Sequence, residues 1–185
     1  MVSTPSSVCV FCGSRDGARP AYVEAARTLG TQMAAEGWRL VYGAGDVGLM
    51  GAVSRAAQEA GGDTFGVIPV HLMAREVAKR DLGRFIVTEN MHERKKVMFM
   101  NSDAIVVLPG GAGTLDEFFE VLTWRQLMLH AKPIYLLDID GYWQPLMQLI
   151  DQVVDQGFAD ASTRDFYSAV GSIDDLMAAL RADLS

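Results

Sequence analysis

Short hydrophobic runs recur along the chain, and each is followed by a turn and then by a segment with helical spacing. Most of the runs are hydrophobic at every position instead of alternating with polar residues, which is typical of parallel strands covered on both faces. The predicted strands are residues 8–12, 39–42, 64–68, 85–88, 104–108 and 134–137. The predicted helices are residues 21–36, 49–60, 92–101, 114–129 and 143–156.

This alternation predicts an α/β fold with a doubly wound parallel sheet, a three-layer α/β/α sandwich with right-handed crossovers. The chain ends with a predicted extended segment at 166–170 and an amphipathic helix at 173–180. With 185 residues, half of them hydrophobic, the sequence is long enough for one substantial core, and we expect a single domain over residues 1–185. In such a fold ligands bind at the carboxyl ends of the strands, so we expect a functional site in the loops that follow them.

Composition narrows the classes of ligand and the compartment. Sixteen Lys and Arg against 23 Asp and Glu give a net charge of −7, which argues against nonspecific binding of nucleic acid or of an anionic membrane. The first residues show no secretory signal, and no hydrophobic segment approaches the roughly 20 residues that span a bilayer, so we expect a cytoplasmic protein. Cys9 and Cys12 form a C-x-x-C pattern inside a predicted strand, where we expect buried thiols on opposite faces rather than a redox pair.

The segment at 43–48, GAGDVG, follows the second predicted strand and matches the G-x-G-x-x-G pattern of dinucleotide-binding loops. An NAD site also calls for an acidic residue at the end of the next strand, but that end is the apolar segment at 68–70, and the nearby Asp63 precedes the strand. We therefore favour tight packing of a helix on the sheet, together with a wall of a shared ligand site, over an NAD site.

The loop after the fifth predicted strand, PGGAGT at 109–114, is a more specific signal. It lacks the Lys-Ser/Thr ending of a P-loop, but its glycines open the backbone to a ligand at a helix start, where free N–H groups and the helix dipole favour a phosphate monoester. Asp116 and Glu117 follow within a turn, and carboxylates beside an anion site need an explanation. Thr114 at the predicted N-cap with Glu117 three residues later is also the pattern of a capping box, in which Glu117 only stabilises the helix.

The densest positive charge lies at 91–96, MHERKK, where the helix after the fourth predicted strand begins. A solvated helix face is the usual meaning of such a run. Cations at a helix start oppose the helix dipole, however, and this favours a ligand-binding role, since arginine can bind phosphate or carboxylate through two hydrogen bonds. His92 is expected to be a cap or a surface residue. With three histidines and no metal-ligand spacing, we predict no metal site and no cofactor.

Five segments together carry a family resemblance: VFCGS at 10–14, VYGAGDVGLMG at 41–51, GVIP at 66–69, MHERK at 91–95 and LPGGAGTLDEFFEVLTW at 108–124. They resemble the LONELY GUY family of cytokinin riboside 5′-monophosphate phosphoribohydrolases, long labelled as possible lysine decarboxylases. The likeness runs from about residue 8 to about residue 158, and the pair MHERK with PGGxGTxxE is highly specific. The decarboxylase label has no support in the residues, because we find no lysine and acid placed to hold pyridoxal phosphate.

The resemblance implies a Rossmann-like homodimer that hydrolyses the N-glycosidic bond of prenylated or plain AMP to a free base and ribose 5-phosphate. It implies that Arg94 and Glu117 are the catalytic pair, with Glu117 facing a ribose that becomes positively charged in the transition state. The implied substrate-binding residues are Glu76, Lys95, Gly110, Gly111, Ala112, Gly113, Thr114 and Thr123. The sequence departs from the family pattern at Ala44, Ala112 and Lys96, and Ala112 leaves less bulk to shape a pocket for the base.

Two questions stay open from the residues alone. The protein is either a phosphoribohydrolase or a non-catalytic binding protein, like the molybdenum-cofactor carriers of the same fold. The presence of both Arg94 and Glu117 favours the enzyme, because a carrier has no need of a carboxylate close to its ligand. Residues 118–129, FFEVLTWRQLML, are hydrophobic around most of a helix, and they form either a buried core helix or a dimer interface.

Overall fold

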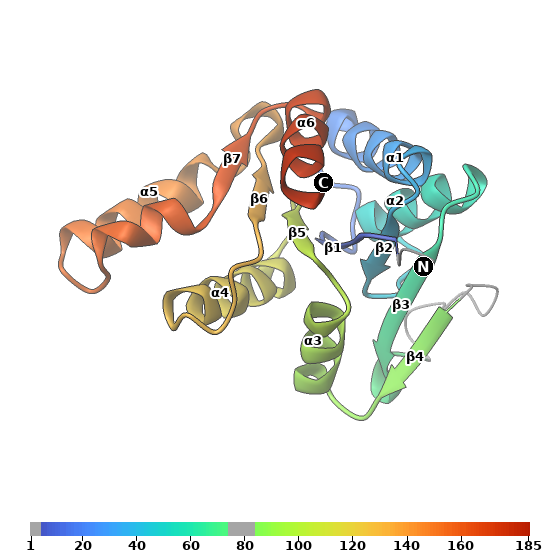
Figure 1. Ribbon diagram of the computed structural model, residues 1–185, viewed down its shortest axis with the longest axis horizontal. Coiled ribbons are helices and arrows are strands. Elements are labelled where there is room, and N and C mark those ends of the chain that lie inside the picture. The colour runs from blue at the N-terminus through green and yellow to red at the C-terminus, as the bar shows by residue number, and fades with distance from the viewer. Residues whose placement is uncertain (1–4, 74–83) are drawn as a thin grey trace.

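The computed structural model describes residues 5–73 and 84–185, which form one seven-stranded parallel sheet with helices on both faces (Figure 1). The strands are β1 (Ser7–Phe11), β2 (Arg39–Tyr42), β3 (Thr64–Pro69), β4 (Arg84–Thr88), β5 (Ala104–Val107), β6 (Ile134–Leu137) and β7 (Ser168–Val170). The helices are α1 (Pro20–Ala35), α2 (Gly48–Glu59), α3 (Met91–Met100), α4 (Ala112–Gln126), α5 (Gln144–Asp155) and α6 (Ile173–Leu184), with short 3-10 turns η1 (Val70–Leu72), η2 (Ile139–Gly141) and η3 (Ala161–Phe166). The predicted doubly wound α/β/α sandwich is confirmed, and its elements differ from the predicted bounds by a few residues.

The strand order is β4-β3-β2-β1-β5-β6-β7, so the chain winds outward from β1 in two directions. The order reverses between β1 and β5, whose residues 8–11 and 104–107 pair in parallel. At such a switch point the loops after the two neighbouring strands turn to opposite faces of the sheet and leave a crevice between them. The fold therefore places its natural ligand position above the carboxyl ends of β1 and β5.

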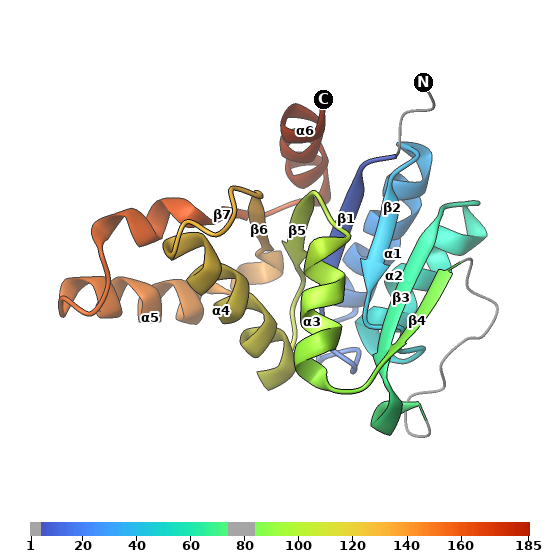
Figure 2. The ribbon, with the colours of Figure 1, turned by 60° about the horizontal axis from the view of Figure 1, so that its bottom comes forward.

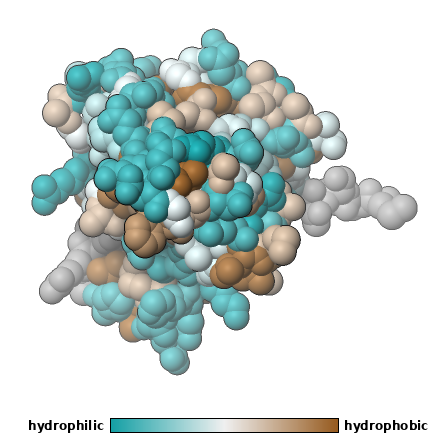
Figure 3. Space-filling view, turned by 90° about the vertical axis from the view of Figure 1, so that its left-hand side faces the viewer, coloured by the Kyte–Doolittle hydropathy of each residue, from teal (hydrophilic) through white to brown (hydrophobic). Residues whose placement is uncertain are grey.

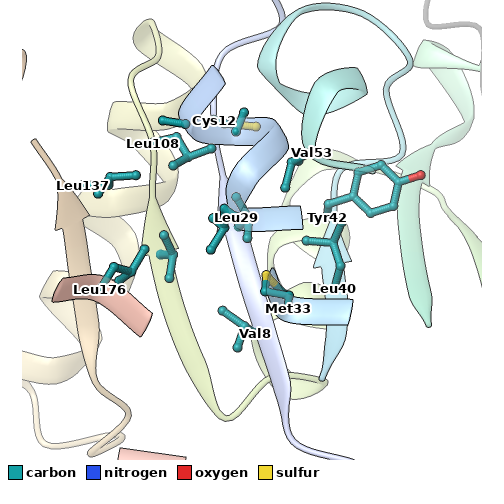
Figure 4. Packing of buried hydrophobic residues seen from close by; sticks show 14 of the residues in the cluster. Val8, Cys12, Leu29, Met33, Leu40, Tyr42, Val53, Leu108, Leu137 and Leu176 are labelled. Atoms are coloured by element: carbon teal, nitrogen blue, oxygen red, sulfur yellow. The ribbon is translucent and has the colours of Figure 1, made fainter. Parts of the chain in front are cut away.

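Two hydrophobic cores lie on the two faces of the sheet, one under α1, α2 and α6 and the other under α3, α4 and α5 (Figure 2). In the first core, Leu29 and Met33 of α1 and Leu176 of α6 pack with Val8 and Leu40 of the sheet (Figure 4). The central strands contribute side chains to both cores. This explains why their sequences are hydrophobic throughout instead of alternating.

Cys9 and Cys12 are free, buried thiols, as predicted. Cys9 packs in the core under α3, α4 and α5, and Cys12 packs in the core on the other face. Burial, together with the negative charge of Glu117, raises the pKa of both thiols. Both are therefore protonated at neutral pH and lack the thiolate character of a redox pair.

Helix α4 ends at Gln126 and is followed by an exposed hydrophobic segment. Met128 has a left-handed backbone with φ 56°, and the N–H of Leu129 donates to the Trp124 carbonyl at 2.9 Å, a helix ending that usually carries glycine. Leu127, Met128 and Leu129 are 60%, 89% and 68% exposed. The interpretation of residues 118–129 as a fully buried helix is therefore wrong.

We expect Met128→Gly to raise the free energy of unfolding by about 1 kcal/mol, because glycine relieves the strain of a side chain in the left-handed region. Met128→Ala is the matched control: it removes the same side chain but keeps the strained Cβ, so the glycine variant should be more stable than the alanine variant by about 1 kcal/mol. Urea unfolding measures both differences. Equal stability of the glycine and alanine variants would contradict the assignment of strain to this position.

Candidate active site

A pocket of about 620 Å³ lies above the carboxyl ends of β1 and β5, at the switch point of the sheet. Its walls come from the loop after β1, the starts of α2 and α3, the glycine loop with the first turns of α4, and the loop after β6. Seven of the ten predicted site residues line it: Arg94, Gly110, Gly111, Ala112, Gly113, Thr114 and Glu117. The fold thus brings the basic helix and the glycine loop to one cavity.

The glycine loop starts α4 earlier than predicted. The helix begins at Ala112, with Gly111 as an extended N-cap, and no described side chain caps this end. The capping-box interpretation is therefore wrong, because Thr114 is the third helical residue and Glu117 lies in the second turn, where it contacts Arg94. Backbone N–H groups at a helix start lack partners within the helix, so an uncapped start that lines a pocket is suited to an anion.

Arg94 is held rigidly at the pocket, with only 5% of the residue exposed. Its Nε donates to the Val67 carbonyl at 3.1 Å, and its Nη2 donates to the Gly43 carbonyl at 3.3 Å. Its Nη1 donates to Glu117 Oε1 at 3.4 Å. The interpretation of the basic run as a solvated face is wrong for this residue, whose guanidinium is anchored by a carbonyl of β3 and a carbonyl of the loop after β2.

The pair formed by Arg94 and Glu117 is buried but loose. The two side chains are 6% and 9% exposed, and their closest N–O distance is 3.4 Å. A charge-assisted hydrogen bond is typically about 2.7–2.9 Å, so this contact is longer than a tight ion pair. Buried ion pairs are weak evidence for stability, and one that lines a pocket favours a chemical role.

Lys95 explains one of the two carboxylates beside the glycine loop. Its Nζ donates to Asp116 Oδ2 at 2.9 Å and also pairs with Glu120. Burial lowers the pKa of Lys95, but the hydrogen bonds to the two carboxylates outweigh burial and raise the pKa. Asp116 therefore pairs with a buried cation of α3. The solvated-face interpretation fits only His92, Glu93 and Lys96 of this run, which are exposed.

Two predicted substrate-binding residues that the structure describes, Lys95 and Thr123, are not among those that line the pocket. Lys95 is engaged with α4, and Thr123 is exposed, with its Oγ1 donating to the Phe119 carbonyl at 2.7 Å. Glu76 lies outside the described residues. The roles assigned to these three residues stay predictions.

Gly43, the first glycine of GAGDVG, leaves space for the guanidinium of Arg94. A Cβ at this position would lie 1.7 Å from Arg94 Nη2. The next residue, Ala44, has φ 60°, a conformation that glycine adopts without strain, which explains the glycine at this position in the family pattern. Leu49 and Met50 at the start of α2 line the pocket. The loop therefore packs closely, as we favoured from the sequence. The predicted ligand wall is not formed by the loop itself, because none of residues 43–48 is among the residues that line the pocket.

Several parts of the pocket wall were not identified from the sequence. They are the loop at 14–18, Tyr22, Leu72 and Tyr142. The loop at 14–18 follows β1 and Tyr142 follows β6, so both lie in the loops where a site was expected, although no residue of either was named as a site residue. Tyr22 lies inside α1 and had no such signal; its ring meets Tyr142 edge-on, with 5.5 Å between the ring centroids.

Comparison with known proteins decides the family. A family model described as "Possible lysine decarboxylase" matches residues 50–180. The cytokinin riboside 5′-monophosphate phosphoribohydrolase LOG5 of Arabidopsis thaliana is 45% identical, over 95% of this chain and 77% of its own length. The chain belongs to the LONELY GUY family. A probable LONELY GUY enzyme of Oryza sativa subsp. japonica, LOG4, is 43% identical over 94% of this chain and 76% of its own.

Solved structures share the fold of this LONELY GUY chain at lower identity. The molybdenum cofactor carrier protein MCP from Chlamydomonas reinhardtii has a TM-score of 0.75 at 23% identity, covering 98% of this chain and 99% of that one. The molybdenum cofactor binding protein from Rippkaea orientalis has a TM-score of 0.74 at 22% identity, with both chains fully covered. At this identity the likeness shows the fold alone.

The word decarboxylase in the family description does not fit the site. Pyridoxal phosphate is held as a Schiff base by a lysine in the active site. Among the described residues, no lysine lines the pocket, and Lys95, which is close in sequence to Arg94, is paired with two carboxylates. The LONELY GUY relatives are accordingly named as phosphoribohydrolases, not as decarboxylases.

Proposed function

We propose that the protein hydrolyses the N-glycosidic bond of cytokinin riboside 5′-monophosphates, which are prenylated AMP, and also of AMP, releasing the free base and ribose 5-phosphate. The observation that carries the proposal is the loose, buried pair of Arg94 and Glu117 in a pocket that also holds an uncapped helix start. The names of the plant relatives support the substrate class.

In this proposal the 5′-phosphate binds at the start of α4. A Cβ at Gly111 or Gly113 would meet no atom within 4 Å, so the backbone there is open to a ligand. The first-turn N–H groups and the positive end of the helix dipole favour a phosphate. Thr114, in the same turn, adds a hydroxyl donor.

Glu117 then stabilises the positive charge that develops on ribose C1′ and O4′ as the bond to the base breaks. A phosphate at the start of α4 brings the ribose toward Glu117, which lies in the second turn of the same helix. The water oxygen bonds to C1′, the electrons of the broken C–N bond leave with the base, and the proton lost by the water ends on the base. Glu117 orients this water or accepts its proton, and Arg94 aligns the carboxylate.

The hydrophobic part of the wall supports a prenylated base. Leu49, Met50, Leu72 and Met91 line the pocket together with the glycine loop. Apolar side chains favour a ligand with a hydrocarbon substituent, because binding removes both surfaces from water. Ala112, which replaces a bulkier residue of the family pattern, leaves this wall more open.

Substrate comparison tests the assignment of the phosphate and the base. Release of free base is measured by chromatography for isopentenyladenosine 5′-monophosphate, for AMP, and for isopentenyladenosine without phosphate. We expect the prenylated monophosphate to have the highest kcat/KM and the unphosphorylated riboside the lowest. Equal kcat/KM with and without the 5′-phosphate would contradict a phosphate site at α4.

We also propose that the protein is a homodimer that associates through the end of α4. Leu127, Met128 and Leu129 are mostly exposed, and so is Met100 at the end of the neighbouring helix α3, with 66% exposure. The two helix ends are adjacent, because Phe99 of α3 packs on Trp124 of α4. Exposed hydrophobic clusters of this kind mark association surfaces. Figure 3 looks at the side of the molecule where α4 and α5 lie, and there hydrophobic residues form patches among hydrophilic ones.

Introducing charge at this surface is expected to dissociate the dimer. We expect Leu127→Asp combined with Leu129→Asp to shift the mass measured by light scattering from two chains toward one, because each carboxylate would be buried without a partner. Leu149→Asp, a matched change at a residue of α5 that is 50% exposed, should leave the mass unchanged. A single-chain mass for the parent protein would refute the proposed dimer.

We place the protein in the cytoplasm. No helix in residues 5–73 and 84–185 is long and apolar enough to cross a membrane. Both cysteines are free, as is usual in a reducing compartment. Cell fractionation tests this, and recovery in a membrane or secreted fraction would refute it.

A further inference from the structure

Tyr142, in the loop after β6, forms a hydrogen bond with the glycine loop. Its hydroxyl donates to the Gly110 carbonyl at 2.6 Å, and its side chain lines the pocket. Gly110 directly precedes the N-cap of α4, where the phosphate is placed in the proposed function. The contact therefore links the loop after β6 to the peptide that leads into the proposed phosphate-binding turn of α4.

The backbone around Tyr142 is built to present this side chain. Asp140 and Gly141, which precede it, both have left-handed backbones, with φ 54° and 73°. Asp138 accepts from the N–H of Trp143 at 2.6 Å, which fixes the start of α5. The Tyr142 ring meets Trp143 edge-on, with 4.7 Å between the centroids, and it meets a second ring from α1 in the same way.

A peptide between two glycines needs such a contact to keep one orientation. Glycine adopts positive and negative φ with similar ease, so the peptide between Gly110 and Gly111 can rotate at low cost. The Cα of Gly110 is already confined, because a Cβ there would lie 2.1 Å from Thr114 Oγ1. A trans peptide is planar with its C=O and N–H pointing in opposite directions, so fixing the Gly110 carbonyl also fixes the Gly111 N–H.

We propose that Tyr142 is a positioning residue that locks the peptide between Gly110 and Gly111, so that the Gly111 N–H is preoriented for the 5′-phosphate. The inference rests on the phosphate site of the proposed function. It does not depend on hydrolysis, because the hydroxyl acts on ground-state binding of the phosphate. Loss of the hydroxyl frees the peptide, and part of the binding energy is then spent in ordering it.

Tyr142→Phe tests the lock, since it keeps the ring contacts and removes only the hydroxyl. We expect the Kd of ribose 5-phosphate and of AMP, measured by calorimetry, to rise about 3- to 10-fold, which is the usual range for one neutral hydrogen bond. The KM of the monophosphate substrate should rise by a similar factor while kcat changes less than about twofold. The affinity for adenosine, which has no phosphate, should stay unchanged.

Tyr135→Phe is the matched control, because it removes another tyrosine hydroxyl bond, from Tyr135 to Asp183 at 2.5 Å, on β6 itself. It should change thermal stability without changing either Kd. Unchanged phosphate affinity in Tyr142→Phe would overturn the inference, and so would an equal loss for adenosine and AMP. If the parent protein binds AMP but does not hydrolyse it, the proposed function fails while this comparison still decides the role of Tyr142. Absence of any AMP or ribose 5-phosphate binding by the parent overturns both.

Discussion

Glu117→Gln is expected to lower kcat for the prenylated monophosphate on the order of 100- to 1,000-fold, the range seen when one preorganised electrostatic group is removed from a transition state. The amide keeps the size of the side chain but lacks the negative charge that faces the developing cation on the ribose. Nucleotide binding should be retained, because the ground-state ribose is neutral. Steady-state kinetics and calorimetric binding of AMP measure the two effects separately.

Glu120→Gln provides the control on the same helix. Glu120 lies one turn after Glu117 and pairs with Lys95, which keeps Asp116 as a second partner. The same loss of one charge should therefore change kcat less than about threefold, because it lies away from the proposed reacting centre. Undiminished turnover in Glu117→Gln, or an equal loss in Glu120→Gln, would refute the proposed role of Glu117.

Gly43→Ala is expected to lower kcat about 100-fold, although the residue touches no substrate in the proposed mechanism. The new Cβ would lie 1.7 Å from Arg94 Nη2, so the guanidinium has to leave the Gly43 carbonyl and shift relative to Glu117. The atom that has to move is the end of a flexible side chain, so the protein should still fold, with about 1–3 kcal/mol lost from its hydrogen bonds. Kinetics and urea unfolding measure the two effects.

The phosphate site is the internal reference for this variant. Affinity for ribose 5-phosphate should stay within about twofold of the parent, because the start of α4 is unchanged. Gly171→Ala is the matched control, since a Cβ there would meet no atom within 4 Å, and it should leave kcat unchanged. A Gly43→Ala protein with parental kcat would show that the position of Arg94 does not matter for the reaction.

Much of the fold followed from the hydrophobic pattern, because continuous apolar runs that alternate with helical spacing have few other solutions. The runs at 39–42 and 134–137 match β2 and β6 residue for residue. The capping-box interpretation was wrong because spacing alone does not show where a helix begins. The N-cap of α4 is Gly111, three residues before Thr114. We predicted that the glycines before Thr114 form a loop, although glycine is also a favoured N-cap residue.

The site was predicted in part, and the remainder depended on contacts across the sheet. Arg94 and Lys95 are neighbours in one basic run, yet Arg94 lines the pocket while Lys95 is buried against α4. Neighbouring residues of a helix project in different directions, and only the packing of the helix shows which of the two side chains faces the pocket. The same packing resolves the carboxylates beside the glycine loop, since Asp116 pairs with Lys95 and Glu117 pairs with Arg94.

The positions of Tyr142 and Gly43 show what a single motif cannot reveal. Tyr142 reaches the Gly110 carbonyl from 32 residues away, and Gly43 meets Arg94 from 51 residues away. Tyr142 lies outside the five segments that carry the family resemblance, and Gly43 lies within one of them, but the motif does not show its contact with Arg94. These two contacts can be predicted only when the strand order is known, because the strand order places the loops after β1, β2, β5 and β6 at one edge of the sheet.

Hydrolysis by the protein is tested by a time course of the parent protein with excess isopentenyladenosine 5′-monophosphate. Free base and ribose 5-phosphate are measured by chromatography and mass spectrometry against the concentration of the chain. We predict that both products appear in equal amounts and exceed the protein concentration many times over. Recovery of intact nucleotide, bound at about one per chain and with no free base, would contradict it and would identify a carrier instead.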